Sequence, residues 1–343
     1  MQIMSVAVII FIFSFVLTWC LRIYALKNNV IDIPNQRSSH SVPTPRGGGV
    51  AIVIAFLVGI AVFSAIEKIT LYQMLSLFIA GFVIAVVGFL DDHGHIAARW
   101  RLLMHFLAAF AGLFFLNQFP TIDLFGYQFS AGLAGMIFGL IYLTWMLNLY
   151  NFMDGINGLA SMEAIFFAFS SCVVIAFAVP NAMETSQVGL LVLLGCAVLG
   201  FIFWNFPKAK IFMGDAGSGF LGIIIGLMIL HISLLDSKLF FAEICLLGVF
   251  IVDATMTLLR RLISGKKVYE AHASHVYQIF ARKYGSHKPV TIAAFIINLV
   301  WLFPVALLIS SGMITGIIGI LIAWLPLIVI AYSNGAGVQD KAN

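Results

Sequence analysis

Long apolar runs constrain the fold of this chain more than any other feature of its sequence. A helix needs about 20 apolar residues to cross the hydrocarbon core of a bilayer, and eleven stretches approach or reach that length. The stretch at 102–117 is short and contains His105, so it is the least typical of the set. The eleven predicted spans are 3–23, 48–66, 70–90, 102–117, 131–149, 159–179, 187–204, 219–235, 239–258, 290–309 and 313–333.

Composition points the same way. Hydrophobic residues make up 62% of the chain and charged residues only 9%, whereas an average soluble domain has roughly 25% charged residues. A soluble protein this apolar could not cover its own surface, so the bilayer must be its solvent. We predict an all-α, polytopic membrane protein forming a single domain over residues 1–343, with 3–23 retained as the first span rather than cleaved as a signal peptide. The net charge of +4 is too small and too dispersed to suggest nucleic acid, and the four cysteines lack metal-ligand spacing.

Lysine and arginine fall almost entirely on one side of this predicted topology. If all eleven segments cross the bilayer, sixteen of the eighteen basic residues share one side, and only Lys68 and Lys238 lie on the other. Because basic residues are enriched in cytoplasmic loops, we predict the N-terminus outside and the C-terminus in the cytoplasm. The predicted cytoplasmic catalytic loops are 24–47, 91–101, 150–158, 205–218 and 259–289.

Two features of these loops indicate sites for anions or cations. Arg46 precedes the glycines Gly47–Gly49, whose backbone amides could approach a phosphate closely; alternatively, the glycines give a flexible entry to the second span. The third span ends on Asp91 and Asp92. Adjacent carboxylates at a membrane boundary are costly unless something pairs with them. A cation or a proton-transfer role, simple solvation at the interface, and a structural ion pair with Arg99 or Arg101 are the alternative explanations.

Two further segments combine carboxylates, carboxamides and glycines. After the fifth span, Asn151 and Asp154 are three residues apart and would share a helix face, and Asn157 extends the row. After the seventh span, Asp215 lies among glycines just before the eighth, where a helix N-terminus favours phosphate. Mg²⁺ typically takes one or two carboxylates and leaves its other positions to phosphates and water. A simple N-cap is the alternative reading of Asp215.

The longest predicted loop carries two histidines, His272 and His275. Their three-residue spacing predicts a shared helix face, and seven basic residues nearby favour contact with phosphate or diphosphate over a cation site. A metal pair and surface histidines without a role are the alternatives.

Taken in order, these motifs resemble the polyprenyl-phosphate N-acetylhexosamine-1-phosphate transferase family. The resemblance rests on the GGG loop, Asp91-Asp92, the segments 151–160 (NFMDGINGLA) and 212–219 (FMGDAGSG), and the late basic, histidine-containing loop. It implies about ten or eleven transmembrane helices around a cytoplasmic cleft in the bacterial inner membrane. It also implies Mg²⁺ (or Mn²⁺), a UDP-N-acetylhexosamine and undecaprenyl phosphate as substrates, and a possible homodimer. The loop 269–289 looks most like the branch that initiates O-antigens, where the sugar can be a 6-deoxy hexosamine.

The resemblance also assigns roles to residues. It implies that Asp215, with Asp154 and Asn151, holds the metal, that Asp91 acts on the lipid phosphate, and that Asp92 supports both. It places Arg46, Gly48, Asn151, Asn157, Asn205 and Phe212 on the substrates, and His272 and His275 on the diphosphate. The chain departs from the pattern at Asn157, where several relatives carry aspartate, and at 272–275, where the translocase members have adjacent histidines.

A competing hypothesis is a secondary transporter, a class that also contains intramembrane carboxylates and helices broken by glycine. Against it, most polar groups here are predicted in cytoplasmic loops. The exceptions are Glu163, Glu243 and Asp253, of which Asp253 could reach the cleft.

Overall fold

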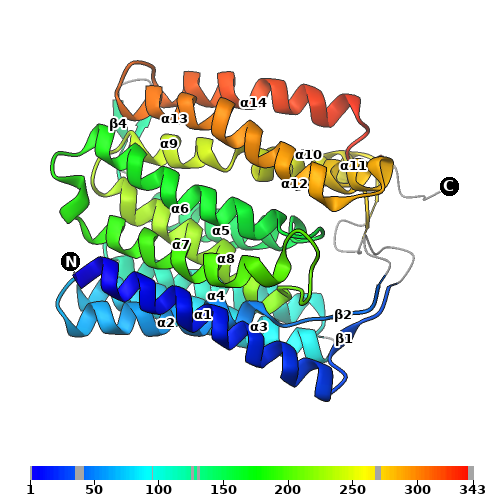
Figure 1. Ribbon diagram of the computed structural model, residues 1–343. Helices are drawn as coiled ribbons and strands as arrows, with labels where there is room; N and C mark the ends of the chain where they lie inside the picture. Colours follow the sequence, from blue (N-terminus) through cyan, green and yellow to red (C-terminus); the bar gives the residue numbers. More distant parts are fainter. Residues whose placement is uncertain are drawn as a thin grey trace.

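The computed structural model describes residues 2–34, 42–94, 96–124, 127–129, 132–266 and 272–338, which form a helical bundle (Figure 1). Short antiparallel strand pairs, β1 with β2 and β3 with β4, interrupt it. In chain order the elements are α1 (Gln2–Lys27), β1 (Ile31–Asp32), β2 (Thr44–Pro45), α2 (Gly49–Ala65), α3 (Leu71–His93), α4 (Ala98–Leu116), β3 (Ile122–Leu124), β4 (Tyr127–Phe129), α5 (Gly132–Phe152), α6 (Leu159–Ala178), η1 (Ala182–Glu184), α7 (Ser186–Asn205), α8 (Asp215–Ser233), α9 (Leu239–Leu246), α10 (Gly248–Ile263), α11 (Val276–Tyr284), α12 (His287–Ile297), η2 (Asn298–Leu302), α13 (Phe303–Ser310) and α14 (Gly316–Ser333).

Every predicted span overlaps a helix, which confirms a polytopic, mainly helical membrane protein. Within the described residues, nine helical stretches are long and apolar enough to cross a membrane, counting α12, η2 and α13 as one. The 17-residue helix α2 is apolar but shorter than a typical span. The number of helices that cross, and the direction in which they cross, stay predictions.

The predicted span at 239–258 is wrong as a single straight helix. It is broken between α9 and α10, whose axes differ by 74°. The two halves also differ in character, because α9 is apolar whereas α10 is amphipathic and ends in Arg260 and Arg261. Together the two halves are still apolar enough to cross a membrane, as a broken span or a re-entrant loop.

Helix α8 forms the centre of the bundle. From Ala216 to Ser233 each of its residues is buried, which suits a helix that is apolar on all sides. Gly222 lets it approach α5 closely, since a Cβ there would lie 2.7 Å from the Cα atom of Leu147. The N-terminal residue of this central helix is Asp215, so packing of the core fixes the position of that carboxylate.

The outer helices present apolar side chains to the surroundings. Phe110 and Phe114 on α4, and Leu321 and Leu325 on α14, are among the many exposed large hydrophobic residues. Such a continuous apolar surface would drive aggregation in water, but it is expected where the surface faces lipid. The fold therefore supports the bilayer as the solvent of these helices.

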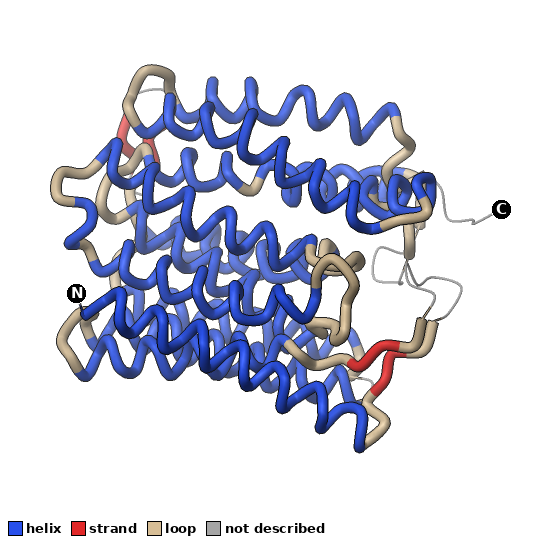
Figure 2. Tube along the Cα trace, viewed as in Figure 1, coloured by secondary structure: helices blue, strands red, loops and turns tan. Residues whose placement is uncertain are grey.

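Successive helices alternate in direction, so the motif-bearing loops meet at one end of the bundle. Figure 1 shows β1, β2 and α11 at that end, and the start of α1 with β4 at the other. Figure 2 shows loops gathered beside the β1–β2 pair. Backbone hydrogen bonds join two of these segments: Phe212 donates to Pro45 O, and Gly48 donates to Phe212 O.

Candidate functional site

The last turn of α3 and the first turn of α8 are held together by Asp92. Its buried carboxylate accepts the backbone N–H groups of Asp215 (3.2 Å) and Ala216 (3.4 Å). Gly88 makes this approach possible, since a Cβ there would lie 2.5 Å from the Ala216 nitrogen. Arg46 lies 3.5 Å from the same carboxylate. Asp92 thus caps α8 and sets the position of Asp215. This role is more specific than the support of both metal and lipid phosphate that the resemblance implied.

Asp91 forms an ion pair with Arg101, which is one of the alternatives left open by the sequence. Its carboxylate pairs with Arg101 on α4 and accepts the N–H of Ile96 at 2.9 Å. Arg101 also lies 3.9 Å from Asp215, so one guanidinium group connects two predicted site residues. A small cavity of about 30 Å³ is lined here by Asp91, Arg101, His105, Asn148, Asn151, Asp215 and neighbouring apolar residues.

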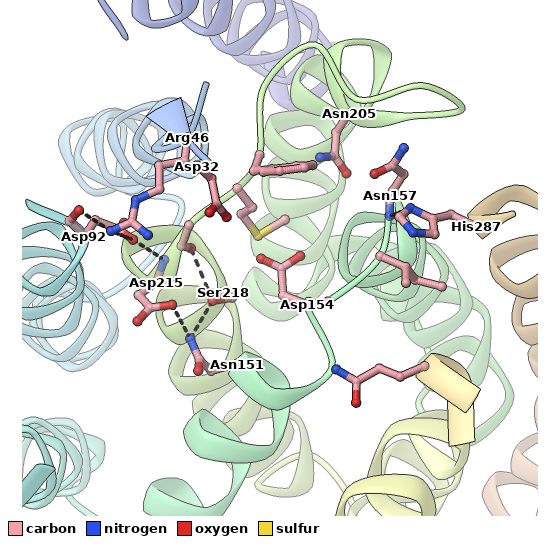
Figure 3. A pocket seen from close by; sticks show the side chains of 16 residues that line it. Asp32, Arg46, Asp92, Asn151, Asp154, Asn157, Asn205, Asp215, Ser218 and His287 are labelled. Carbon is pink, nitrogen blue, oxygen red and sulfur yellow. Dashed lines mark hydrogen bonds and ion pairs between the residues drawn. The ribbon is translucent and has the colours of Figure 1, made fainter. Parts of the chain in front are cut away.

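A larger cavity of about 230 Å³ shares Asn151 and Asp215 with the small one. Figure 3 shows carboxylates and Arg46 toward one end of it and Asn157 with His287 toward the other, with Asp154 between them. The lining combines eight of the predicted site residues with several that were not predicted. The side chains that line it include Asp32, Arg46, Asp92, Asn151, Asp154, Asn157, Asn205, Phe212, Asp215, Ser218, Gln278 and His287.

Asn151 orients the carboxylate of Asp215. Its side-chain amide donates to Asp215 Oδ1 at 3.0 Å and to Ser218 Oγ at 2.9 Å. The spacing of Asn151 and Asp154 was predicted to place both on one side of a helix end, and both do line the large cavity. In this arrangement Asn151 acts as a hydrogen-bond donor to the predicted metal ligand, so its assignment as a direct ligand stays a prediction.

Asp154 lies just beyond the end of α5, among other negative groups. Removal from water raises the pKa of its carboxyl group well above the usual value, and the nearby carboxylates of Asp215 and Asp92 raise it further. A bound cation would favour the ionised form instead. This accumulation of acidic groups is the electrostatic environment expected of a cation site.

Replacement of Asp154 by Asn should stabilise the protein in a chelating buffer at neutral pH. Folding raises the pKa of this carboxyl group above its unfolded value of about 4. Its contribution to the free energy of unfolding is therefore fully present below pH 4 and is lost as the pH rises through the folded pKa. Asp154→Asn removes this loss, so its melting temperature should exceed that of the wild type by a few degrees, at about 2–4 °C per kcal/mol. The difference should vanish near pH 4.

Thermal melts with and without Mg²⁺ complete this test. Mg²⁺ should stabilise the wild type by mass action and stabilise Asp154→Asn much less. An Asp154→Asn protein that melts below the wild type in chelator would show that the carboxylate is already compensated by the protein.

The donor set fits a magnesium ion that is shared with a substrate. Within the described residues, no three His, Cys, Asp or Glu side chains are grouped closely enough to bind a metal by themselves. Mg²⁺ does not need such a group, because it is usually held by one or two carboxylates together with phosphates and water. Asp215 and Asp154, on one cavity with room for a diphosphate, meet that requirement.

Two predicted substrate contacts turn out to hold the loops in place. The N–H groups of Gly48 and Gly49 donate to the carbonyls of Phe212 and Met213, so they do not cradle an anion as predicted. Asn205 is buried, accepts the N–H of Gly158 at 2.8 Å and donates to Ile211 O at 3.1 Å. Phe212, in contrast, lines the cavity as expected of a residue that contacts substrate.

The two predicted histidines do lie together, with ring centroids 5.0 Å apart, but neither lines the large cavity. Helix α11 begins at Val276, so His272 and His275 precede it and do not share a helix face. His275 is buried and lies 3.3 Å from Asp253. Asp253 also accepts the N–H groups of Val276 and Tyr277, and therefore caps α11 instead of reaching the cleft. His272 contacts Ser274 at 3.0 Å.

Sequence reasoning missed several residues that the structure brings to the two cavities, among them Asp32, Arg101, Gln278 and His287. Asp32 and Gln278 have no distinctive local pattern. Arg101 was noted only as an ion-pair partner, although it lies between the two predicted carboxylates. His287 follows a helix-starting serine in the segment 285–289, which resembled the family but was given no role; its position at the start of α12 was the available signal.

The remaining buried carboxylates do not form a pathway through the bundle. Glu163 accepts a hydrogen bond from Asn298, and Glu243 accepts one from Ser171. Both carboxylates therefore pair within the helices. The charged cluster lies instead at one end of the bundle, which does not favour the transporter hypothesis.

Comparison with known proteins agrees with this geometry. The family model "Glycosyl transferase family 4" matches residues 74–233, which run from α3 to the end of α8. The chain is 29% identical over 293 residues to a probable undecaprenyl-phosphate N-acetylglucosaminyl 1-phosphate transferase of Bacillus subtilis, covering 83% of this chain and 79% of that relative. It is 27% identical to the undecaprenyl-phosphate alpha-N-acetylglucosaminyl 1-phosphate transferase of Thermotoga maritima, covering 82% and 83%. It is 30% identical to the phospho-N-acetylmuramoyl-pentapeptide-transferase of Streptococcus pyogenes, covering 64% and 69%.

Proposed function

Because this chain belongs to glycosyl transferase family 4, we propose that it is a UDP-sugar:undecaprenyl-phosphate sugar-1-phosphate transferase of the bacterial inner membrane. It transfers an N-acetylhexosamine 1-phosphate to undecaprenyl phosphate, releases UMP, and so initiates a surface polysaccharide such as O-antigen. The named relatives from Bacillus subtilis and Thermotoga maritima support a polyprenyl phosphate acceptor and an N-acetylglucosaminyl 1-phosphate group. The loop that resembles O-antigen-initiating members supports an N-acetylated hexosamine, with 6-deoxy sugars among the candidates.

One observation carries this proposal: two cavities meet at Asp215. Asn151 and Asp215 line both of them. The larger has carboxylates, Arg46 and Phe212 and suits a nucleotide sugar with its cation. The smaller, between α3, α4 and α5, has Asp91 and Arg101 and suits the phosphate of a lipid acceptor. A reaction between two phosphate compounds needs such a pair of sites sharing one wall.

The proposed reaction is a single phosphoryl transfer. An oxygen of the lipid phosphate attacks the phosphorus that bears the sugar, and the bond from this phosphorus to the oxygen shared with UMP breaks. That oxygen leaves with UMP, and the product is a lipid diphosphate sugar. Because the attacking and attacked groups are both anionic, positive charge must be concentrated between them.

Residues around the cavities can meet that requirement. Arg101 brings a guanidinium group to the acceptor side, where Asp91 holds its orientation. Arg46 supplies a second cation on the donor side and is itself held by Asp92. Asp215 and Asp154 would hold Mg²⁺, which when bound neutralises the diphosphate and stabilises the departing UMP. Phe212 provides an aromatic surface against which a nucleobase can stack.

An assay of purified protein tests this function directly. Detergent-solubilised protein, given undecaprenyl phosphate, Mg²⁺ and a UDP-sugar labelled in the sugar, should produce a labelled lipid and release UMP in equal amounts. A panel of UDP-N-acetylglucosamine, UDP-N-acetylgalactosamine and 6-deoxy UDP-N-acetylhexosamines would identify the donor.

Two controls make the result decisive. The lipid product should be absent when a chelator replaces Mg²⁺ and when undecaprenyl phosphate is left out. Release of free sugar phosphate without lipid product, or uptake into vesicles without chemical change of the sugar, would contradict the proposed transfer.

A further inference from the structure

The backbone of Asn157 is held on both of its polar sides by one helix. Its N–H donates to His287 Nδ1 at 3.3 Å, and its carbonyl accepts the hydroxyl of Thr291 at 2.9 Å. His287 and Thr291 are four residues apart on α12, so they lie on the same helix face. Figure 3 shows the His287 ring beside Asn157 at the cavity wall. Together they fix one backbone segment of the cavity wall.

Both contacts are partly buried, and both are made to this one segment. Thr291 is fully buried. If packing alone mattered, a valine of the same shape would serve at this position, so the hydroxyl group indicates a role for its hydrogen bond. On its other side the loop is anchored by the contact between Asn205 and Gly158. The loop that carries Asp154 is therefore stretched between α7 and α12, two helices that do not take part in holding Asp215.

We propose that His287 and Thr291 are a positioning pair that fixes the 154–158 loop for the nucleotide sugar, so that α12 sets the affinity for the donor and not for the lipid acceptor. This inference rests on the proposed function. The donor is the substrate concerned because Asp154 and Asn157 line the larger cavity and are absent from the wall of the smaller one. Both side chains act through Asn157, and through it on the neighbouring Asp154.

Matched variants separate the hydrogen bonds from the packing. Thr291→Val keeps the shape of the side chain and removes its hydroxyl, whereas Thr291→Ser keeps the hydroxyl. His287→Asn retains an acceptor near the position of Nδ1, whereas His287→Gln places its polar group farther out. Thr18→Val is the control, since Thr18 is also buried and donates to a backbone carbonyl, that of Ser14, on α1.

Three measurements report on these variants: the Kd of UMP with Mg²⁺ by calorimetry, the KM and kcat for each substrate, and hydrogen exchange of peptides that cover residues 152–159. Thr291→Val and His287→Gln should raise the Kd of UMP and the KM for the UDP-sugar about tenfold, as expected for the loss of one buried hydrogen bond. The KM for undecaprenyl phosphate and kcat should change much less, and exchange over 152–159 should become faster. Thr291→Ser and His287→Asn should recover most of the affinity.

The proposal is overturned if Thr291→Val and His287→Gln bind UMP as the wild type does, or if Thr18→Val weakens binding equally. It is also overturned if acceptor KM rises in step with donor KM. Failure of the proposed function is a different result: the wild type would make no lipid product and bind no UMP, while hydrogen exchange would still reveal whether α12 holds the loop.

Discussion

Asp215→Asn is expected to reduce turnover by 10²–10³-fold or more, the range found when one group that stabilises transition-state charge is removed. The carboxylate stands at the N-terminus of the buried helix α8, where Asp92 holds its backbone and Asn151 its side chain. An amide at this position offers only a neutral oxygen to a cation. Because the geometry around residue 215 is fixed by the core, little rearrangement can compensate for the lost charge.

The measurement is lipid-product formation as a function of Mg²⁺ concentration, together with calorimetric titration of Mg²⁺ in the presence of UMP. Asp215→Ala should fare no better than Asp215→Asn. Asp236→Asn is the control, because Asp236 is an aspartate in the connection between α8 and α9 that pairs with Lys238. Turnover near the wild-type level at limiting Mg²⁺ would remove Asp215 from the metal site.

The helices and the grouping of the motifs could be predicted because the bilayer leaves few alternatives. Backbone polar groups in lipid must be satisfied within the segment, so long apolar runs become helices. Alternating helices then bring every second loop to the same end. That reasoning placed Asp91, Asp154 and Asp215 around one cluster before any contact was known, and the two cavities confirm that they lie together.

The partners of individual polar groups could not be predicted in the same way. A glycine amide looks like a phosphate ligand until its hydrogen bond to Phe212, far along the chain, is known. His272 and His275 were expected on one helix face, yet both precede α11, and His275 pairs with Asp253 in α10. The break between α9 and α10 was hidden because both halves are partly apolar. The errors about Gly48 and His275 concern contacts between distant segments, on which local pattern gives no information.

Asp91→Asn is expected to slow the chemical step by 10²–10⁴-fold, the usual contribution of a general base, while leaving UDP-sugar affinity nearly intact. The structure gives a reason for this separation. Asp91 lines the smaller cavity and is absent from the wall of the larger one, where the donor is proposed to bind. Its carboxylate can receive a proton from the acceptor phosphate, whose second pKa is near 6, and it holds Arg101. Both roles concern the acceptor.

Phe212→Ala should have the opposite effect, because Phe212 lines only the donor cavity of the two. Loss of a stacked base weakens binding by roughly 1–3 kcal/mol, so nucleotide affinity should fall while the rate at saturating substrate falls much less. Calorimetry with UMP and the lipid-product assay, performed on both variants, give the two quantities.

One interaction could couple the acceptor side to donor binding, and the experiment must control for it. Arg101 lies 3.9 Å from Asp215, so the loss of its partner in Asp91→Asn frees it to pair with the proposed metal ligand and to compete with Mg²⁺. Titrations at saturating Mg²⁺ remove that competition, and an Asp91→Asn/Arg101→Gln double variant abolishes it. If Asp91 acts on the acceptor, the single and double variants should both retain UMP binding and both react slowly. Loss of nucleotide binding in the double variant, with a normal rate at saturating substrate, would show that the division between donor and acceptor sides is wrong.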